Sequence, residues 1–179
     1  FGAEPIFEDA TKALNLGIGG GQVAWGDFNN DGWEDLHDGG LWINESGKKF
    51  SRFNGKGPSG HGIWGDYNND GWLDFYSWSN GKLYRNEAGK KFVDVTPKAL
   101  VGRPMKVSRG AAWMDMDNDG YLDLYVAGYE IWQKAVYADA LYRNVEGKDF
   151  VAHELPKARN MSARGVSAAD FDADGDVDV

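Results

Sequence analysis

The sequence predicts an all-β protein, a β-propeller of four-stranded blades, with about three and a half blades in its 179 residues. Two observations lead to this prediction. A segment of the form Asp-x-Asn/Asp-x-Asp-Gly begins at positions 27, 66, 115 and 170, so the chain repeats at intervals of 39, 49 and 55 residues. Helix signals are weak, whereas short apolar segments with alternating or β-branched residues recur in the repeats. Since three and a half blades do not close a ring, we expect them to belong to a ring of six or seven, or to a smaller ring that a second chain completes.

Each repeat is predicted to contain four short strands. The first, as in 23–28, alternates apolar with small or polar residues, and the second, as in 73–78 and 122–126, is rich in aromatic and β-branched residues. The third strand begins at a leucine and the fourth, after a glycine-bearing turn, at a phenylalanine, in the pairs Leu41 and Phe50, Leu83 and Phe92, and Leu141 and Phe150.

These elements set the predicted limits of the blades. Residues 1–11 are expected to form the outer strand of a closing or preceding blade, because Phe7-Glu-Asp-Ala-Thr11 resembles Phe92-Val-Asp-Val-Thr96. One helical turn is predicted within each of 11–14 and 97–100. The blades themselves are expected at 12–55, 56–97, 98–155 and, incompletely, 156–179, with Trp25, Trp64, Trp113 and Ala168 filling the space between them.

Composition excludes several classes of protein. With 28 acidic and 19 basic residues the net charge is −9, which is unfavourable for binding nucleic acid. The absence of cysteine excludes disulfides, thiolate metal sites and cysteine nucleophiles. No apolar run approaches the roughly 20 residues that a transmembrane helix needs. These features fit an extracellular or periplasmic protein.

The four Asp-rich segments are candidate metal sites. In each, positions 1, 3, 5 and 9 have oxygen-bearing side chains, position 6 is glycine, and the carbonyl of position 7 is expected to face the ion. Such all-oxygen sets suit Ca²⁺, of which up to four ions are expected, one for each segment. The predicted ligands, position 7 included, are Asp27, Asn29, Asp31, Trp33 and Asp35; Asp66, Asn68, Asp70, Trp72 and Asp74; Asp115, Asp117, Asp119, Tyr121 and Asp123; and Asp170, Asp172, Asp174, Asp176 and Asp178.

Other interpretations of these segments are weaker. An EF-hand requires a glutamate at position 12 and flanking helices, but position 12 is Asp38, Ser77 or Val126 in the first three segments and the flanks favour strands. The glycine-rich period of a calcium β-roll is absent. Turns without metal are an alternative, yet positions 1, 3, 5 and 9 hold 14 of the 28 acidic side chains, and four Ca²⁺ ions would change the net charge from −9 to −1.

The repeated Asp-Phe-Asn-Asn-Asp-Gly-Trp-Glu-Asp pattern, together with Leu-Tyr-Arg-Asn and Gly-Lys-Lys-Phe, resembles the FG-GAP/VCBS repeat. That repeat occurs in integrin α-chain propellers, and the form found here is most similar to cartilage acidic protein and UnbV-type secreted proteins. The resemblance implies a seven-bladed extracellular propeller with calcium in its loops. Members of this family include adhesion domains, lectin-like modules and non-catalytic parts of enzymes, so the resemblance implies a role of one of these kinds. His37 and Asp38 depart from the apolar residues usual after Leu36.

Function beyond calcium is expected in an insertion of about ten residues within 128–139. Its aromatic residues Tyr129, Trp132 and Tyr137 are candidate ligand contacts, or else they pack against the propeller. No catalytic motif appears; His61 is a conceivable acid or base but better explained as an ordinary histidine. We therefore expect a non-catalytic binding or adhesion module for protein or glycan. The alternatives are a propeller domain of a larger secreted enzyme acting on polysaccharide, and a structural role in a surface assembly.

Overall fold

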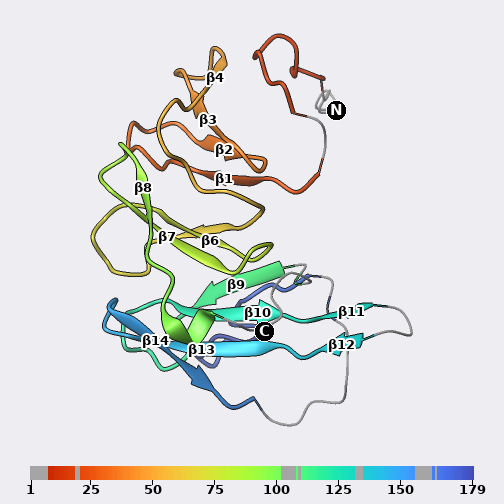
Figure 1. Ribbon diagram of the computed structural model, residues 1–179, viewed down its shortest axis with the longest axis vertical. Helices are drawn as coiled ribbons and strands as arrows, with labels where there is room; N and C mark the ends of the chain where they lie inside the picture. Colours follow the sequence, from red (N-terminus) through yellow and green to blue (C-terminus); the bar gives the residue numbers. More distant parts are fainter. Residues whose placement is uncertain are drawn as a thin grey trace, which may run out of the picture.

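The computed structural model describes residues 8–18, 21–101, 108, 110–131, 135–155, 163 and 165–179. It contains three four-stranded antiparallel sheets that follow one another along the chain and stack in that order, which confirms the predicted all-β fold of four-stranded units (Figure 1). We call these sheets blades 1, 2 and 3. The completion of a ring by further blades stays a prediction.

Each blade keeps the order of its strands along the chain. Hairpin registers such as Gly26 opposite Asp35 and Gly65 opposite Asp74 place an aspartate as the first residue of the second strand. Blade 1 contains β1 Ala24–Gly26, β2 Asp35–His37, β3 Leu41–Asn44 and β4 Phe50–Arg52; blade 2 contains β5 Ile63–Gly65, β6 Asp74–Ser77, β7 Lys82–Asn86 and β8 Phe92–Asp94; blade 3 contains β9 Gly110–Met114, β10 Asp123–Ala127, β13 Ala140–Val145 and β14 Asp149–His153.

Three further features complete the description. The insertion in blade 3 forms a separate two-stranded hairpin of β11 Tyr129–Ile131 and β12 Ala135–Tyr137. The fourth repeat contains a single bridge between Ala169 and Asp178. No helix among the described residues is long and apolar enough to cross a membrane, and the only regular one there is the 3-10 helix Lys98–Leu100.

Aromatic side chains fill the space between neighbouring blades, as the sequence predicts for Trp64 and Trp113. The Trp64 ring packs against Gly26 of blade 1 so closely that a Cβ added to that glycine would lie 2.8 Å from the indole Cδ1. Gly65 has the same relation to Trp113, with 2.6 Å to its Cδ1. Trp25, at the equivalent position of blade 1, is 53% exposed. The glycines that end β1 and β5 therefore allow the next blade to approach.

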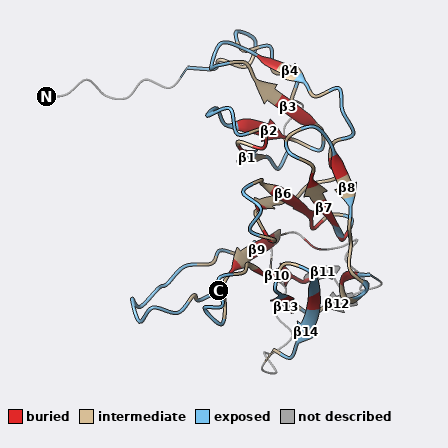
Figure 2. Cartoon of the chain, turned by 90° about the vertical axis from the view of Figure 1, so that its left-hand side faces the viewer, coloured by how far each residue is buried: buried red, intermediate tan, exposed pale blue. Residues whose placement is uncertain are grey.

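The hydrophobic core is shared between blades. One cluster joins Phe28 of blade 1 to Phe75 and Phe92 of blade 2, and another joins Tyr76 of blade 2 to Tyr142 of blade 3. Figure 2 shows the buried residues along the stacked strands and the exposed ones in the connecting loops. Because a single blade leaves its faces uncovered, packing between blades is needed to bury these side chains.

The outer strand predicted at 1–11 falls mostly outside the described residues and stays a prediction. Residues 1–7 lie outside the described part, 8–10 have no regular structure, and 11–15 form the predicted turn. The Leu14 carbonyl accepts a hydrogen bond from the Phe50 N–H at 2.7 Å, so this segment covers the outer edge of blade 1. The Lys56 carbonyl accepts from the Phe92 N–H of blade 2 in the same way, at 2.9 Å. The helical turn predicted within 97–100 is confirmed.

Candidate metal centres

The four Asp-rich segments form loops 1 to 4, at residues 27–35, 66–74, 115–123 and 170–178. Loops 1 to 3 connect the first two strands of their blades. The ligand at position 9 begins the second strand and is buried, whereas positions 1 to 6 lie in the turn between the two strands. The flanking strands confirm that these are not EF-hands.

Each loop is closed by its own carboxylates. The aspartate at position 1 accepts hydrogen bonds from the backbone N–H groups of positions 5 and 6; for Asp27 these come from Asp31 at 3.0 Å and Gly32 at 2.8 Å. The aspartate at position 5 accepts from the N–H of position 7, as Asp31 does from Trp33 at 3.0 Å. The glycine at position 6 has φ near +87° in loop 1, a conformation that other residues adopt at a cost. The same bonds recur in the other three loops.

The buried aspartates at position 9 are incompletely bonded in loops 1 and 2. Asp35 and Asp74 each accept one hydrogen bond through Oδ1, from the N–H of Asn44 and of Asn86, both at 2.8 Å. Both side chains are 0% exposed, and their Oδ2 atoms have no hydrogen-bond partner among the described residues. A buried carboxylate oxygen without a partner is energetically unfavourable unless the group is protonated or faces a cation.

Burial also dominates the electrostatics of these two groups. It raises the pKa of Asp35 to about 7 and that of Asp74 to about 8, and the other carboxylates of each loop add to the increase. The backbone N–H groups of Phe28 and Tyr67 lower these pKa values somewhat, but not in a hydrogen-bonding geometry that would satisfy Oδ2. Metal-free loops 1 and 2 therefore favour a protonated position 9 near neutral pH.

Loops 3 and 4 place their carboxylates close together. Oxygen atoms of Asp115, Asp117 and Asp123 lie within 4.8 Å of one another, and those of Asp170, Asp172 and Asp174 do so as well. In loop 3, Oδ2 of Asp123 accepts a hydrogen bond from the Met116 N–H at 2.8 Å. Loop 4 is exposed throughout except for half-buried Val177, and Phe171 at its position 2 is 87% exposed.

An arginine neutralises part of loop 3. Arg143 on β13 forms an ion pair with Asp117 and a second with Asp119, at 3.1 Å from Nη2 to Oδ2. Arg85, at the equivalent position of blade 2, instead pairs with Glu87 at 2.6 Å. Consequently a cationic side chain faces the ligands at positions 3 and 5 in loop 3, but not in loop 2.

The donor sets fit a hard divalent cation. All the predicted side-chain ligands offer oxygen, and in loops 3 and 4 three of the carboxylates lie close together, whereas among the described residues no such group of three is found in loops 1 and 2. That the carbonyls of Trp33, Trp72, Tyr121 and Asp176 face an ion stays a prediction.

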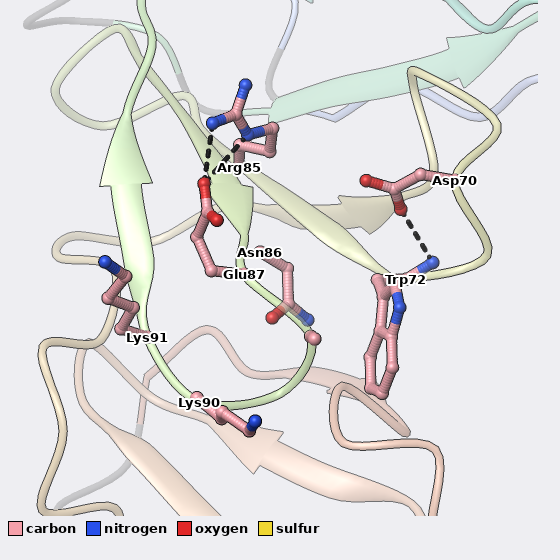
Figure 3. Close-up of a pocket in the computed structure, with 8 residues that line it drawn as sticks. Asp70, Trp72, Arg85, Asn86, Glu87, Lys90 and Lys91 are labelled. Atoms are coloured by element: carbon pink, nitrogen blue, oxygen red, sulfur yellow. Dashed lines mark hydrogen bonds and ion pairs between the residues drawn. The ribbon is translucent and has the colours of Figure 1, made fainter.

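A groove that sequence reasoning missed lies beside loop 2 (Figure 3). Its volume is about 490 Å³, and Trp72 of loop 2 and the hairpin between β7 and β8 form its walls. The hairpin contributes Arg85, Asn86, Glu87, Ala88, Lys90 and Lys91, and the loop also contributes Asp70. The sequence does show several charged residues between Arg85 and Lys91. It does not show that they lie beside Trp72.

The remaining residues that the sequence singled out are the aromatic residues of the insertion and two histidines. Trp132 lies outside the described residues, and only the backbone of Tyr129 is described, in β11, whereas Tyr137 in β12 is half-buried. His37 is buried, and its ring faces the Pro58 carbonyl and the Gly39 N–H, each at 3.3 Å. The Nδ1 atom of His61 lies 3.1 Å from the Gln22 carbonyl. These histidines therefore bond to backbone rather than to one another.

Comparison with known proteins supports the repeat assignment. Residues 66–126, from the start of loop 2 to the last but one residue of β10, match the family model of the FG-GAP-like repeat. A search of curated proteins found no match to the chain. The matched region contains loops 2 and 3 and the whole of blade 2 from β6 onwards.

Proposed function

We propose that this FG-GAP-like repeat protein is a calcium-binding β-propeller module that acts outside the cell as a non-catalytic binding or adhesion module for protein or carbohydrate. The observation that carries the calcium part is the pair of buried, unpartnered Oδ2 atoms of Asp35 and Asp74. Each belongs to position 9 of a loop whose remaining oxygen ligands lie in the turn directly before it.

Calcium resolves the electrostatic conflict that each loop contains. Three or four carboxylates in one loop repel one another, and a divalent cation turns that repulsion into attraction. Ca²⁺ accepts six to eight oxygen ligands in flexible geometry, which suits sets that mix carboxylate, amide and carbonyl oxygens. Loops on the surface are expected to bind with the modest affinity of extracellular modules, and millimolar calcium outside the cell would fill them.

Isothermal titration calorimetry with calcium tests this proposal on the intact chain. We expect more than one ion to bind, and Asp35→Asn to reduce the number of ions by one. Glu34→Gln is the matched control, because Glu34 is an exposed acid in loop 1 that is not a predicted ligand. Equal stoichiometry in all three proteins would contradict the assignment of loop 1.

The groove beside loop 2 supports the ligand-binding part of the proposal. The indole of Trp72 offers a face for stacking, and the lining has three basic residues, Arg85, Lys90 and Lys91, against two acidic ones, Asp70 and Glu87, in a chain with a net charge of −9. Arg85 is already paired with Glu87, so the two lysines are the cations left to meet a ligand. Such a groove suits a carbohydrate with an acidic group.

Binding of an oligouronate, compared with its uncharged methyl ester, tests the groove. We expect the acid to bind in the presence of calcium and the ester not to bind, with Lys90→Ala weakening the interaction. Lys48→Ala changes an exposed hairpin lysine of blade 1 and should have no effect. Cleavage of the oligouronate by the intact chain would instead favour the enzyme-domain alternative.

A further inference from the structure

Loops of neighbouring blades are joined by the asparagine at position 4. Asn30 and Asn69 donate through Nδ2 to the carbonyls of Gly71 and Gly120 in the next loop, at 2.9 and 2.8 Å. Asn118 donates to Oδ1 of Asp176 in loop 4 at 3.1 Å. The series ends there, because loop 4 has Ala173 at this position.

The bond reaches the predicted ligands through one rigid unit. The Gly71 carbonyl that accepts from Asn30 shares its peptide plane with the Trp72 N–H, which donates to Oδ1 of Asp70 at 3.0 Å. On the donor side, Asn30 lies between the ligands at positions 3 and 5 of loop 1. When those ligands move to bind an ion, Asn30 moves with them, and so does its hydrogen bond to the Gly71 carbonyl of the next loop. Loops 2 and 3 repeat the arrangement, with 3.0 Å from the Tyr121 N–H to Asp119.

A second, buried connection runs between the same loops. The N–H of Asn86 holds Oδ1 of Asp74 at 2.8 Å, while its Nδ2 donates to the carbonyl of Phe28 in loop 1 at 2.7 Å. Asn144 does the same for Asp123 and the carbonyl of Tyr67, at 2.6 and 2.8 Å. Position 9 of one loop and position 2 of the loop before it thus share one asparagine.

Backbone conformation alone does not explain the asparagines at position 4. Asn30, Asn69 and Asn118 all have φ of +56°, a region that asparagine tolerates better than most residues. This accounts for an asparagine at that position, but not for an amide that donates to the following loop in all three cases. Glycine at the same position would keep the conformation and remove the bond, which separates the two explanations.

We infer that the calcium sites of adjacent blades are energetically coupled through these asparagines, so that an ion in one loop raises the calcium affinity of the next. Asn30 and Asn69 are positioning residues: they restrain the peptide that holds a ligand of the neighbouring loop. The inference rests on the proposed calcium binding. One to two hydrogen bonds between loops correspond to a coupling of about threefold to tenfold in affinity. Reciprocity requires the same factor in both directions.

Calcium titration followed by ¹⁵N-¹H NMR tests the coupling site by site. The amides of Gly32 and Gly71, each bonded to the position 1 carboxylate of its own loop at 2.8 Å, report on loops 1 and 2 separately. Asp35→Asn weakens loop 1. We expect it to raise the calcium midpoint of Gly71 about threefold to tenfold in the otherwise wild-type chain, and by a smaller factor in the Asn30→Gly background, where only the connection through Asn86 remains. Ser46→Gly, at an exposed hairpin residue with φ of +55°, is the control background and should preserve the shift.

The outcomes separate the coupling from calcium binding itself. If neither amide responds to calcium, the proposed function fails and the coupling fails with it. If both respond but Asp35→Asn leaves the Gly71 midpoint in place, calcium binding stands and the coupling is wrong. A shift of undiminished size in the Asn30→Gly background would also overturn the role of that residue. Should Asn30→Gly not fold, Asp74→Asn with Asn69→Gly applies the same test to loops 2 and 3, read at the Gly120 amide.

Discussion

The substitution Asp74→Asn is predicted to stabilise the calcium-free protein and to remove the stabilisation that calcium gives the wild-type loop. Ionised Asp74 is buried with one oxygen unpartnered, and burial raises its pKa from 3.8 to about 8. At about 1.4 kcal/mol for each tenfold change in the protonation equilibrium, ionisation at pH 8.5 destabilises the metal-free fold by on the order of 5 kcal/mol at most. Asparagine is isosteric and neutral, so it removes this penalty.

Calcium narrows the difference in stability between the two proteins. An ion at one hundred times its dissociation constant stabilises the wild-type loop by about 2.7 kcal/mol, or roughly 5–10 °C in a domain of this size. The Asn variant loses that gain, because it supplies no charge at position 9. Differential scanning calorimetry at pH 8.5, in EDTA and in calcium, measures both effects.

The control and the refuting result follow from the same logic. Asp94→Asn removes an exposed acid of blade 2 that pairs with Lys82, and its small effect should be the same in EDTA and in calcium. If Asp74→Asn destabilises the protein equally under both conditions, the carboxylate serves the fold and not an ion, and the reasoning is refuted.

Three further predictions follow from the loops and the blade contacts. The pKa values of Asp35 and Asp74 are raised to about 7 and 8, so the folded metal-free protein binds more protons than the unfolded chain. Its free energy of unfolding in EDTA, measured with urea, should therefore fall as the pH rises from about 4 to 8. In calcium this trend should be abolished or reversed. Arg143→Gln should raise the calcium affinity of loop 3, measured at the Gly120 amide, because the arginine no longer competes for Asp117 and Asp119; unchanged affinity would show that it does not compete. Gly65→Ala should lower the free energy of unfolding by about 1–3 kcal/mol, because the added Cβ would lie 2.6 Å from the Trp113 ring, whereas Gly165→Ala, with open space around it, should be close to neutral in urea unfolding.

The repeats allowed the strands and the candidate ligands to be predicted, because both depend on local spacing. A ligand at positions 1, 3, 5 or 9 belongs to the same nine-residue turn, so no knowledge of the three-dimensional fold is needed to group them. The phenylalanines and leucines that begin the outer strands are likewise spaced from the loops within each repeat.

Contacts between repeats could not be predicted in this way. The bond from Asn30 to Gly71 spans 41 residues, and it exists only because consecutive blades stack loop beside loop. The groove at Trp72 likewise depends on how a hairpin packs against its loop. The hydrogen bond from Phe50 to the Leu14 carbonyl, at the outer edge of blade 1, also joins residues from separate parts of the chain.

The two Leu-Tyr-Arg-Asn segments show how two differences elsewhere in the repeat change the partner of the arginine. Arg85 is followed two residues later by Glu87, with which it pairs, whereas Arg143 is followed by Val145. Without that acid, and with Asp117 in place of the asparagine of loop 2, Arg143 turns to the loop instead. The identical motif therefore supports the hairpin in blade 2 and opposes cation binding in blade 3.

A crystal structure of the protein grown in millimolar calcium, with anomalous scattering to locate the ions, tests the central claim most directly. The account predicts ions in loops 1 and 2, with Oδ2 of Asp35 and of Asp74 among their ligands at about 2.3–2.6 Å. Loops that hold no ion under these conditions, with both Oδ2 atoms still buried and unbound, would contradict it.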